Sequence, residues 1–262
     1  MRARVEGVSV VGSGIADWDQ ARAILRGERA WRAEPLKLPS PALLSPNERR
    51  RASPFVRMAL RAAEEACERA GRAPGSLDCV FASALGDGSV AHAVLSALTR
   101  EGRPVSPTHF HNSVHNAVAG YWSIGNANHE AGTSLAAGDG SFGTALLKAL
   151  LSVAVEGRPT ELVAVEHPFP EPLAAKRPVT APLAVALVLA PVSDEGGDGP
   201  VIRMAGASEG PASEPRMTGL RDLWAGVSAG RAIPLLEALG TSGSVVVEAG
   251  RGYFMALEVE AP

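Results

Sequence analysis

Hydrophobic residues along the chain fall into short continuous runs and helical spacings, which predicts strands separated by helices. Nearly continuous apolar runs predict four buried strands, at residues 8–12, 78–83, 161–166 and 181–190. Helical spacing is clearest over residues 54–71, where Phe55, Met58 and Ala62 share one face and Pro54 suits the first turn. Strands that alternate with helices indicate parallel βαβ units in a layered sheet.

The same pattern assigns the remaining segments. Further helices are expected at residues 16–27, 90–99 and 117–124, and extended chain at 35–46, 105–114 and 130–134. Residues 136–155 are almost wholly apolar and predict a long helix that is buried on every side. The polar loop 193–199 is the expected internal boundary, and beyond it we expect a strand at 201–205, a helix at 233–239 and a strand pair within 244–260.

Composition narrows the class of protein. Of 262 residues, 46% are hydrophobic and 20% charged, so a sizeable core is feasible. Twenty-five Lys and Arg against 28 Asp and Glu argue against a general nucleic-acid binder. No apolar stretch is long enough for a membrane span, and Glu6 interrupts what a signal peptide would need. Only Cys67 and Cys79 are present, so we expect a cytoplasmic α/β protein without a disulfide scaffold.

Three histidines, His109, His111 and His115, stand within seven residues and form the densest polar cluster. On a helix His111 and His115 would share a face, as zinc ligands can, but no nearby cysteine or acidic residue completes a ligand set. We therefore expect no metal. The favoured interpretation is that these imidazoles, with Asn112, hydrogen-bond loop backbone along a buried cleft.

Two glycine-bearing turns could carry chemistry. Residues 12–14 follow a strand, but Asp17 replaces the third glycine of a dinucleotide loop and would repel a pyrophosphate. Residues 132–138 run from a strand toward a buried helix, where several α/β enzymes place a nucleophile. Leu135 occupies the apex of that turn and Ser134 is the nearest hydroxyl, outside any G-x-S-x-G pattern.

Taken in order, the segments resemble the N-terminal half of a β-ketoacyl synthase of the thiolase fold. Residues 8–27 resemble the family's first strand and its W-x-x-L-x-x-G helix, and residues 47–66 resemble the helix before its second strand. The stretch 109–120 resembles F-x-x-T-x-x-N-x-x-A-G, and 131–138 resembles the nucleophile loop T-A-C-A-T-G. Residues 182–190 resemble the strand after the family's G-E-G-A turn, so the likeness covers roughly residues 5–192.

The resemblance implies a layered αβαβα fold, with an intact N-terminal half at residues 1–192. A shortened C-terminal half, residues 193–262, would pack on the same core. The family's active-site cysteine falls on Leu135, and no histidine follows Gly199 to serve as either catalytic histidine. All three catalytic residues would therefore be absent, and neither cofactor nor metal is implied.

The nearest subgroup resembles the short chain-length-factor-like subunits of aryl polyene and related pigment pathways. Such a subunit would pair with an active ketosynthase, which handles acyl chains on acyl carrier protein, and would help to shape the tunnel for the growing chain. The candidate tunnel-lining residues are His109, His111, Asn112, His115, Ser134 and Leu135. The alternative is a thiolase-fold hydrolase or acyltransferase that uses Ser134 or Ser113 with His111 or His115.

Overall fold

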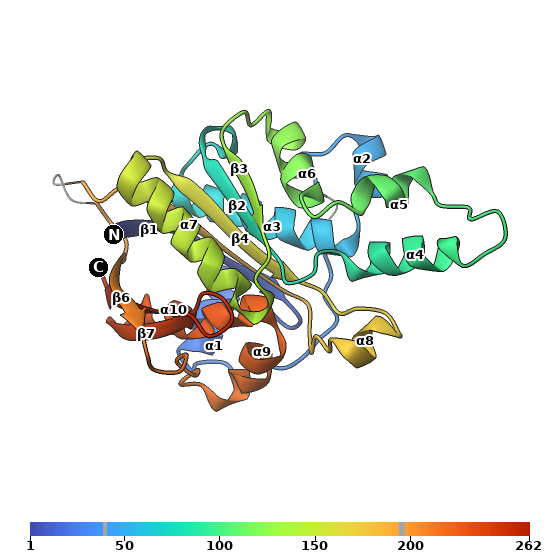
Figure 1. Cartoon of the computed structure of the whole chain (residues 1–262). Helices are drawn as coiled ribbons and strands as arrows, with labels where there is room; N and C mark the ends of the chain where they lie inside the picture. Colours follow the sequence, from blue (N-terminus) through green and yellow to red (C-terminus); the bar gives the residue numbers. More distant parts are fainter. Residues whose placement is uncertain (39–40, 194–196) are drawn as a thin grey trace.

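The computed structural model describes residues 1–38, 41–193 and 197–262 and is built around one mixed sheet of eight strands. The strands lie in the order β3-β2-β4-β5-β1-β6-β8-β7 (Figure 1). Their bounds are β1 (Arg2–Gly12), β2 (Asp78–Ala82), β3 (Gly132–Leu135), β4 (Thr160–Glu166), β5 (Leu183–Ala190), β6 (Val201–Ser208), β7 (Gly243–Glu248) and β8 (Phe254–Glu260).

The described α-helices are α1 (Trp18–Leu25), α2 (Pro46–Arg51), α3 (Pro54–Ala70), α4 (Gly88–Leu98), α5 (Pro107–Asn112), α6 (Ala117–Asn126), α7 (Ser141–Glu156), α8 (Leu173–Lys176), α9 (Arg221–Gly226) and α10 (Ile233–Ala238). Short 3₁₀ turns include η2 (Gly138–Gly140) before α7 and η4 (Ser228–Ala232) before α10. None of the helices in the described part of the chain is long and apolar enough to cross a bilayer.

Parallel pairing is confined to three strands. β2 pairs in parallel with both β3 and β4, whereas every other pair in the described sheet is antiparallel. The prediction of parallel βαβ units is therefore right for β2, β3 and β4 and wrong for the other strands. Between β4 and β5 the described chain forms only the four-residue α8 in place of a full crossover helix, and β5 returns antiparallel.

Helix α3 shows how local sequence fixes one layer. Ser53 caps its N-terminus by accepting from the Val56 amide, and Gly71 ends it in the left-handed region at φ 62°. The helix lies so close to β1 that a side chain on Gly7 would meet the Ala66 carbonyl, 2.0 Å from the Cβ position. With α6 it buries one face of the sheet.

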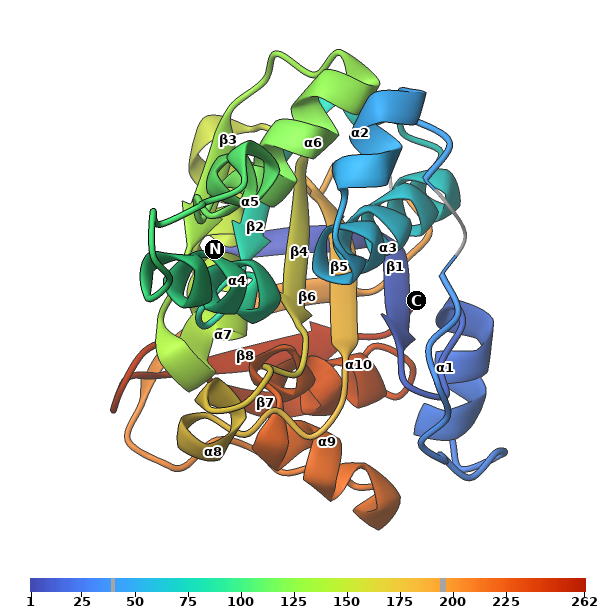
Figure 2. The ribbon, with the colours of Figure 1, turned by 90° about the vertical axis from the view of Figure 1, so that its right-hand side faces the viewer.

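Helix α7 covers the opposite face. Leu146 and Leu150 of α7 share one hydrophobic cluster with residues of the central strands and with Leu235 of α10. Val245 of β7 and Leu257 of β8 belong to the same cluster. Figure 2 shows α3 and α7 on opposite sides of β4 and β5. Helices α3 and α6 therefore cover one face of the sheet and α7 the other, and the same sheet continues through β6 and β8 to β7, which also contacts α7. Burial alternates along these last strands, so their outer face stays partly exposed.

Two helix predictions need correction. The long helix begins at Ser141 rather than residue 136, because Gly138 at φ 58° and Gly140 form η2 first. It is also not buried on every side, since Leu151 is 39% and Val155 72% exposed. Residues 107–112, expected to be extended, form α5, because Ser106 caps the helix and Pro107 stands at its first position. Of the predicted polar loop 193–199, residues 194–196 lie outside the described chain.

Candidate functional site

The carboxyl ends of β3, β2 and β4 meet at one edge of the sheet, where open α/β sheets bind ligands. Leu135 ends β3 and is partly buried against the main core cluster. Its carbonyl accepts from the Ser83 amide at 3.2 Å, and η2 follows before α7 begins. The position that the family resemblance assigns to a nucleophile is therefore held by a partly buried aliphatic side chain that packs against the core.

A tight turn follows Leu135. Ser141 accepts from the Ala137 amide at 3.0 Å and donates to the Gly138 carbonyl at 2.7 Å. A Cβ on Gly140 would lie 2.3 Å from the Gly250 amide nitrogen, because the β7–β8 turn packs directly on η2. The C-terminal hairpin therefore closes this turn from outside.

Glu166 is the buried polar centre of the edge, and sequence reasoning missed it. One carboxylate oxygen, Oε1, accepts from Ser83 Oγ at 3.1 Å, from Ser228 Oγ at 2.8 Å and from the Ala84 amide. The other, Oε2, is buried without a hydrogen-bond partner. Burial raises the pKa of the Glu166 carboxyl, and the hydrogen bonds from Ala84, Ser228 and Ser83 oppose that shift. The carboxyl joins β4 to the β2–α4 loop and to η4.

The histidine-rich segment lies on α5 and the following loop. His109 and His111 are exposed, and His111 meets the Tyr121 ring edge-on at 6.4 Å. Asn112 is buried, donating to the Arg51 carbonyl at 2.9 Å and accepting from the Tyr121 hydroxyl at 3.0 Å. His115 is exposed but reaches the Ser83 carbonyl, with Nε2 at 3.4 Å. Of the three histidines in this segment, His115 alone contacts a residue at the strand ends.

No serine–histidine pair assembles from these residues. Ser134 lies on β3 opposite Phe81, and Ser113 donates to the Phe110 carbonyl at 2.8 Å. Across the described ranges no hydrogen bond links Ser134 or Ser113 to a histidine. The same residues contain no group of three or more His, Cys, Asp or Glu side chains arranged to hold a metal ion.

The glycine turn after β1 is filled by protein. Ser13 donates through Oγ to the Glu34 carbonyl at 2.8 Å, and the Trp31 indole donates to the Ser13 carbonyl at 2.9 Å. A Cβ on Gly14 would lie 1.9 Å from the Arg32 carbonyl oxygen. The turn is therefore covered by the segment from Trp31 to Glu34.

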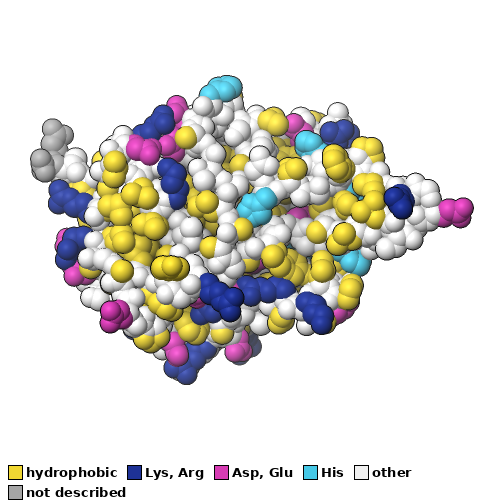
Figure 3. Space-filling model, viewed as in Figure 1, with side chains coloured by type: hydrophobic (Ala, Val, Ile, Leu, Met, Phe, Trp, Pro, Cys, Tyr) yellow, Lys and Arg dark blue, Asp and Glu magenta, His cyan; other side chains and the backbone are white. Residues whose placement is uncertain are grey.

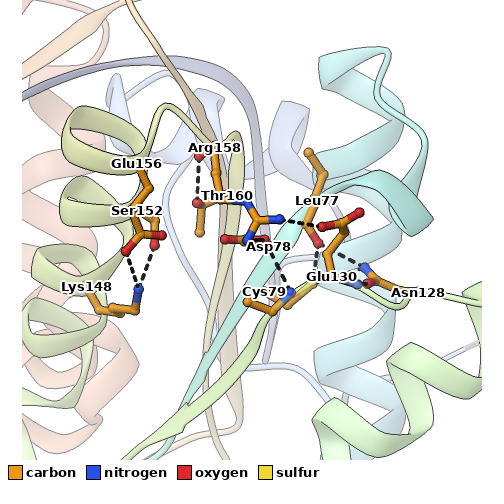
Figure 4. Close-up of polar contacts among 11 residues, drawn as sticks. Leu77, Asp78, Cys79, Asn128, Glu130, Lys148, Ser152, Glu156, Arg158 and Thr160 are labelled. Carbon is orange, nitrogen blue, oxygen red and sulfur yellow. Dashed lines mark hydrogen bonds and ion pairs between the residues drawn. The ribbon is translucent and has the colours of Figure 1, made fainter.

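At the amino ends of the same strands, ion pairs fix β3 in place (Figure 4). Arg158 lies 2.8 Å from Glu130 and 3.5 Å from the buried Asp78, whose carboxylate also accepts from the Ala131 amide at 3.3 Å. Asn128 donates to the Leu77 carbonyl at 3.0 Å. These contacts tie the start of β3 to β2 and β4, so this cluster serves the structure.

Comparisons with known proteins identify a family, through a family model, and a fold, through solved structures. The model of the β-ketoacyl synthase N-terminal domain matches residues 18–220. No curated protein matches the chain. Among solved structures, a chain of the ketosynthase ApeO in complex with its chain length factor ApeC from Xenorhabdus doucetiae is 21% identical. The match covers 98% of this chain and 99% of that one, with a TM-score of 0.71.

Two further structures share the fold at 14% identity, each covering 100% of this chain and 99% of the other. They are the ishigamide ketosynthase/chain length factor, with a TM-score of 0.72, and AntDE:AntF, an acyl-carrier protein in complex with its ketosynthase, with a TM-score of 0.70. The alignments therefore run over almost the whole of this chain and of each matched chain. The thiolase-like fold expected from the sequence is confirmed.

Proposed function

Because the chain belongs to the β-ketoacyl synthase family, we propose that it is a non-catalytic ketosynthase-like subunit, a chain-length factor. It pairs with an active β-ketoacyl synthase that elongates polyene or fatty-acid-type chains on acyl carrier protein. Its residues complete the dimer and shape the tunnel for the growing chain. A cytoplasmic location is part of this proposal.

The observation that carries the proposal is Leu135. A side chain without a nucleophilic atom occupies the apex where a synthase forms its acyl-thioester, and it packs, partly buried, against the core. The nearby hydroxyls of Ser83 and Ser228 both donate to Glu166 and so are engaged in holding the fold. Nothing at this edge supplies an activated nucleophile.

The titles of the structural neighbours support the same role. Two of them are ketosynthase and chain length factor pairs, and the alignments run over almost the whole of this chain and of each matched chain. The division into halves at residues 1–192 and 193–262 remains part of the proposal.

An exposed surface beside β3 fits a second subunit. β3 lies at the end of the sheet, and α4 and α5 project beyond it (Figure 1). Apolar side chains gather over this projection in Figure 3. The exposed large hydrophobic residues on and around it are Leu85, Leu95, Leu98, Phe110, Val114 and Ile124. A group of exposed large hydrophobic side chains is typical of an interaction site in a soluble protein.

The main chain of β3 is also available. The carbonyls of Ala131, just before β3, and of Leu135, at its end, accept from the β2 side, at 2.8 Å from the Cys79 amide and 3.2 Å from the Ser83 amide. Because alternate residues of a parallel strand bond to one neighbour, the peptide groups of Gly132 and Ser134 face the open edge. An exposed edge of this kind pairs readily with a strand of another chain.

Reconstitution tests the function. The ketosynthase encoded beside this chain is incubated with acyl and malonyl carrier proteins, with and without the chain. We expect elongated product of defined length only when both are present, and intact-mass spectrometry shows acylation of the ketosynthase alone. The matched variant Ser134→Ala should leave product unchanged. A stable acyl group on Ser134 that this variant removes would instead establish the hydrolase or acyltransferase.

A further inference from the structure

Helices α4 and α5 and the loop between them form an arm, residues 88–112, that projects beyond the open edge at β3 (Figure 1). The arm contributes no residue to either hydrophobic core cluster of the described chain. Helix α4 is apolar along most of its length, yet Leu95 and Leu98 are 57% and 47% exposed. Its buried residues are Gly88, Val90 and Ala97. Among the described helices and strands α4 packs mainly on α5, so the arm lies largely outside the core.

Close contacts hold the arm at its two ends. At the start, the Phe169 ring packs on Gly88 so tightly that a Cβ there would lie 1.9 Å from the ring. At the end, Asn112 donates to the Arg51 carbonyl at 2.9 Å. Between these ends, no hydrogen bond or ion pair in the described ranges links residues 92–109 to a residue outside the arm.

The sequence gives α4 little helical stability of its own. The helix has 11 residues, and isolated helices shorter than about 12–15 residues are marginal in water. Its residues of low helix propensity are Gly88, Ser89, Val90, Val94 and Ser96. Helix α5, with six residues, is shorter still. Both helices therefore depend on packing for their stability, and this chain supplies little of it.

The charged residues of the arm are confined to its tip. Arg100, Glu101 and Arg103 stand in the loop between the helices, and neither α4 nor α5 contains Lys, Arg, Asp or Glu. Apolar surface free of charge is typical of a permanent protein interface. In the proposed function the ketosynthase pairs along β3, the strand beyond which the arm projects.

We propose that the arm is a folding unit of its own, which opens locally in the free chain and is fixed as α4 and α5 when the ketosynthase covers it. Segments with few buried apolar contacts open at a lower free energy than the core. Ordering the arm consumes part of the binding free energy, so association of the subunits is coupled to folding of this segment. The identity of the covering surface rests on the proposed function, whereas the local opening is a property of this chain alone.

Hydrogen exchange measured by mass spectrometry tests the arm. The full chain, kept in solution as a fusion to maltose-binding protein, is compared with the same fusion in complex with the ketosynthase. In the free chain, peptides from residues 90–111 should exchange at least about tenfold faster than peptides from α3. In the complex, the arm peptides should slow by at least about tenfold while those from α3 stay unchanged.

The two parts of this experiment fail separately. An arm as protected as α3 in the free chain, or an arm whose exchange does not change in a complex that forms, would overturn the proposal. Absence of a complex would contradict the proposed function instead, and the free chain would still decide whether the arm opens on its own.

A proline in each helix separates the arm from the core. Ala93→Pro breaks α4 near its centre, and Ala62→Pro is the matched change in α3. Ala93→Pro should leave the exchange of α3 and β5 unchanged and weaken binding to the ketosynthase at least about tenfold, whereas Ala62→Pro should expose the core. Faster exchange of α3 in Ala93→Pro would show that arm and core fold as one unit. Wild-type affinity in that variant would show that the partner does not fix the arm, and either result would overturn the proposal.

Discussion

Ser228 donates to Glu166 across 62 residues of sequence, with an Oγ–Oε1 distance of 2.8 Å. The bond ties η4, in the C-terminal part of the chain, to the end of β4 in the N-terminal part. The same carboxylate oxygen accepts from Ser83 and Ala84, so three segments meet on one acceptor. In this protein the carboxyl edge of the parallel strands is held together by a structural carboxyl group.

Glu166→Ala should lower the free energy of unfolding by about 2–4 kcal/mol, because two hydroxyls and one amide lose a buried acceptor. Glu166→Gln keeps one carbonyl oxygen as acceptor and should cost less than half as much. Urea unfolding of the two variants and the wild type provides the comparison. If Glu166→Ala and Glu166→Gln lowered the free energy of unfolding equally, the carboxylate oxygen would not stabilise the fold as a hydrogen-bond acceptor.

Stability should fall as pH rises through the range in which Glu161 titrates. Burial raises the pKa of this carboxyl from its ordinary value of 4.5 to about 8. The folded state therefore holds a proton that the unfolded chain releases, and stability declines by about 1.4 kcal/mol per pH unit between the two values. Below the unfolded pKa this contribution is fully present, and above pH 8 the loss is complete.

The matched variant for Glu161 is Glu161→Gln, which cannot titrate. The difference in unfolding free energy between it and the wild type should grow steadily from pH 5.5 to pH 7.5. Burial also raises the pKa of Glu166, in the same direction, but that contribution is common to both proteins and cancels. A difference that is independent of pH would show that Glu161 is ionised in the folded state.

Neither cysteine should react with thiol reagents in the folded protein. Cys67 and Cys79 are buried on either side of Glu161, with Sγ–carboxylate distances of 3.3 and 3.9 Å, and burial strongly raises the pKa of both thiols. Because the thiolate is the reactive form, modification requires opening of the fold. Ellman's reagent should react slowly without denaturant and with two thiols in 6 M guanidinium; rapid native reaction would disprove this burial.

Leu135→Cys should not make the isolated chain a synthase. The variant gains a thiol at the end of β3, but His115 is exposed and contacts a main-chain carbonyl, and His167, which follows β4, lies 3.1 Å from the Pro168 carbonyl. Activation of the thiol and decarboxylation of a malonyl group still lack their histidines. Mass spectrometry with acyl and malonyl carrier proteins should show no ketoacyl product. Formation of ketoacyl product would contradict the conclusion that the chain lacks the catalytic histidines of a synthase.

The sequence predicted most strands and the long helices because their hydrophobic periods are strong. It failed at α5, where proline and histidine suggested extended chain although Ser106 and Pro107 form a good helix start. It also extended parallel pairing to β5 and β1. Strand direction there depends on the brief α8 connection, and apolar runs alone do not reveal direction.

The candidate site was only partly predictable. The motif likeness placed Leu135 at the turn after β3, where the structure has it. Glu166 escaped notice because it stands at the end of an apolar strand and its partners, Ser83 and Ser228, lie 83 and 62 residues away. The cavity of about 630 Å³ beside β1 was also not predictable from the sequence, because residues near both ends of the chain line it.

The role of β3 as the pairing edge can be tested by single substitutions. Ser134→Pro removes an amide that faces the open edge while leaving the ladder to β2 intact, and proline is tolerated at such edge positions. Ser134→Thr keeps the amide and is the matched control. Thermal unfolding should show that both variants are folded. In co-expression with the ketosynthase, only the proline variant should fail to form the complex.

The most direct measurement of the central claim is size-exclusion chromatography with light scattering on this 27.0 kDa chain co-expressed with its ketosynthase. We predict a 1:1 complex for the wild type and Ser134→Thr, dissociation in Ser134→Pro, and self-association or poor solubility of the chain expressed alone. A well-behaved monomer that ignores the co-expressed ketosynthase would contradict the assignment as a chain-length factor.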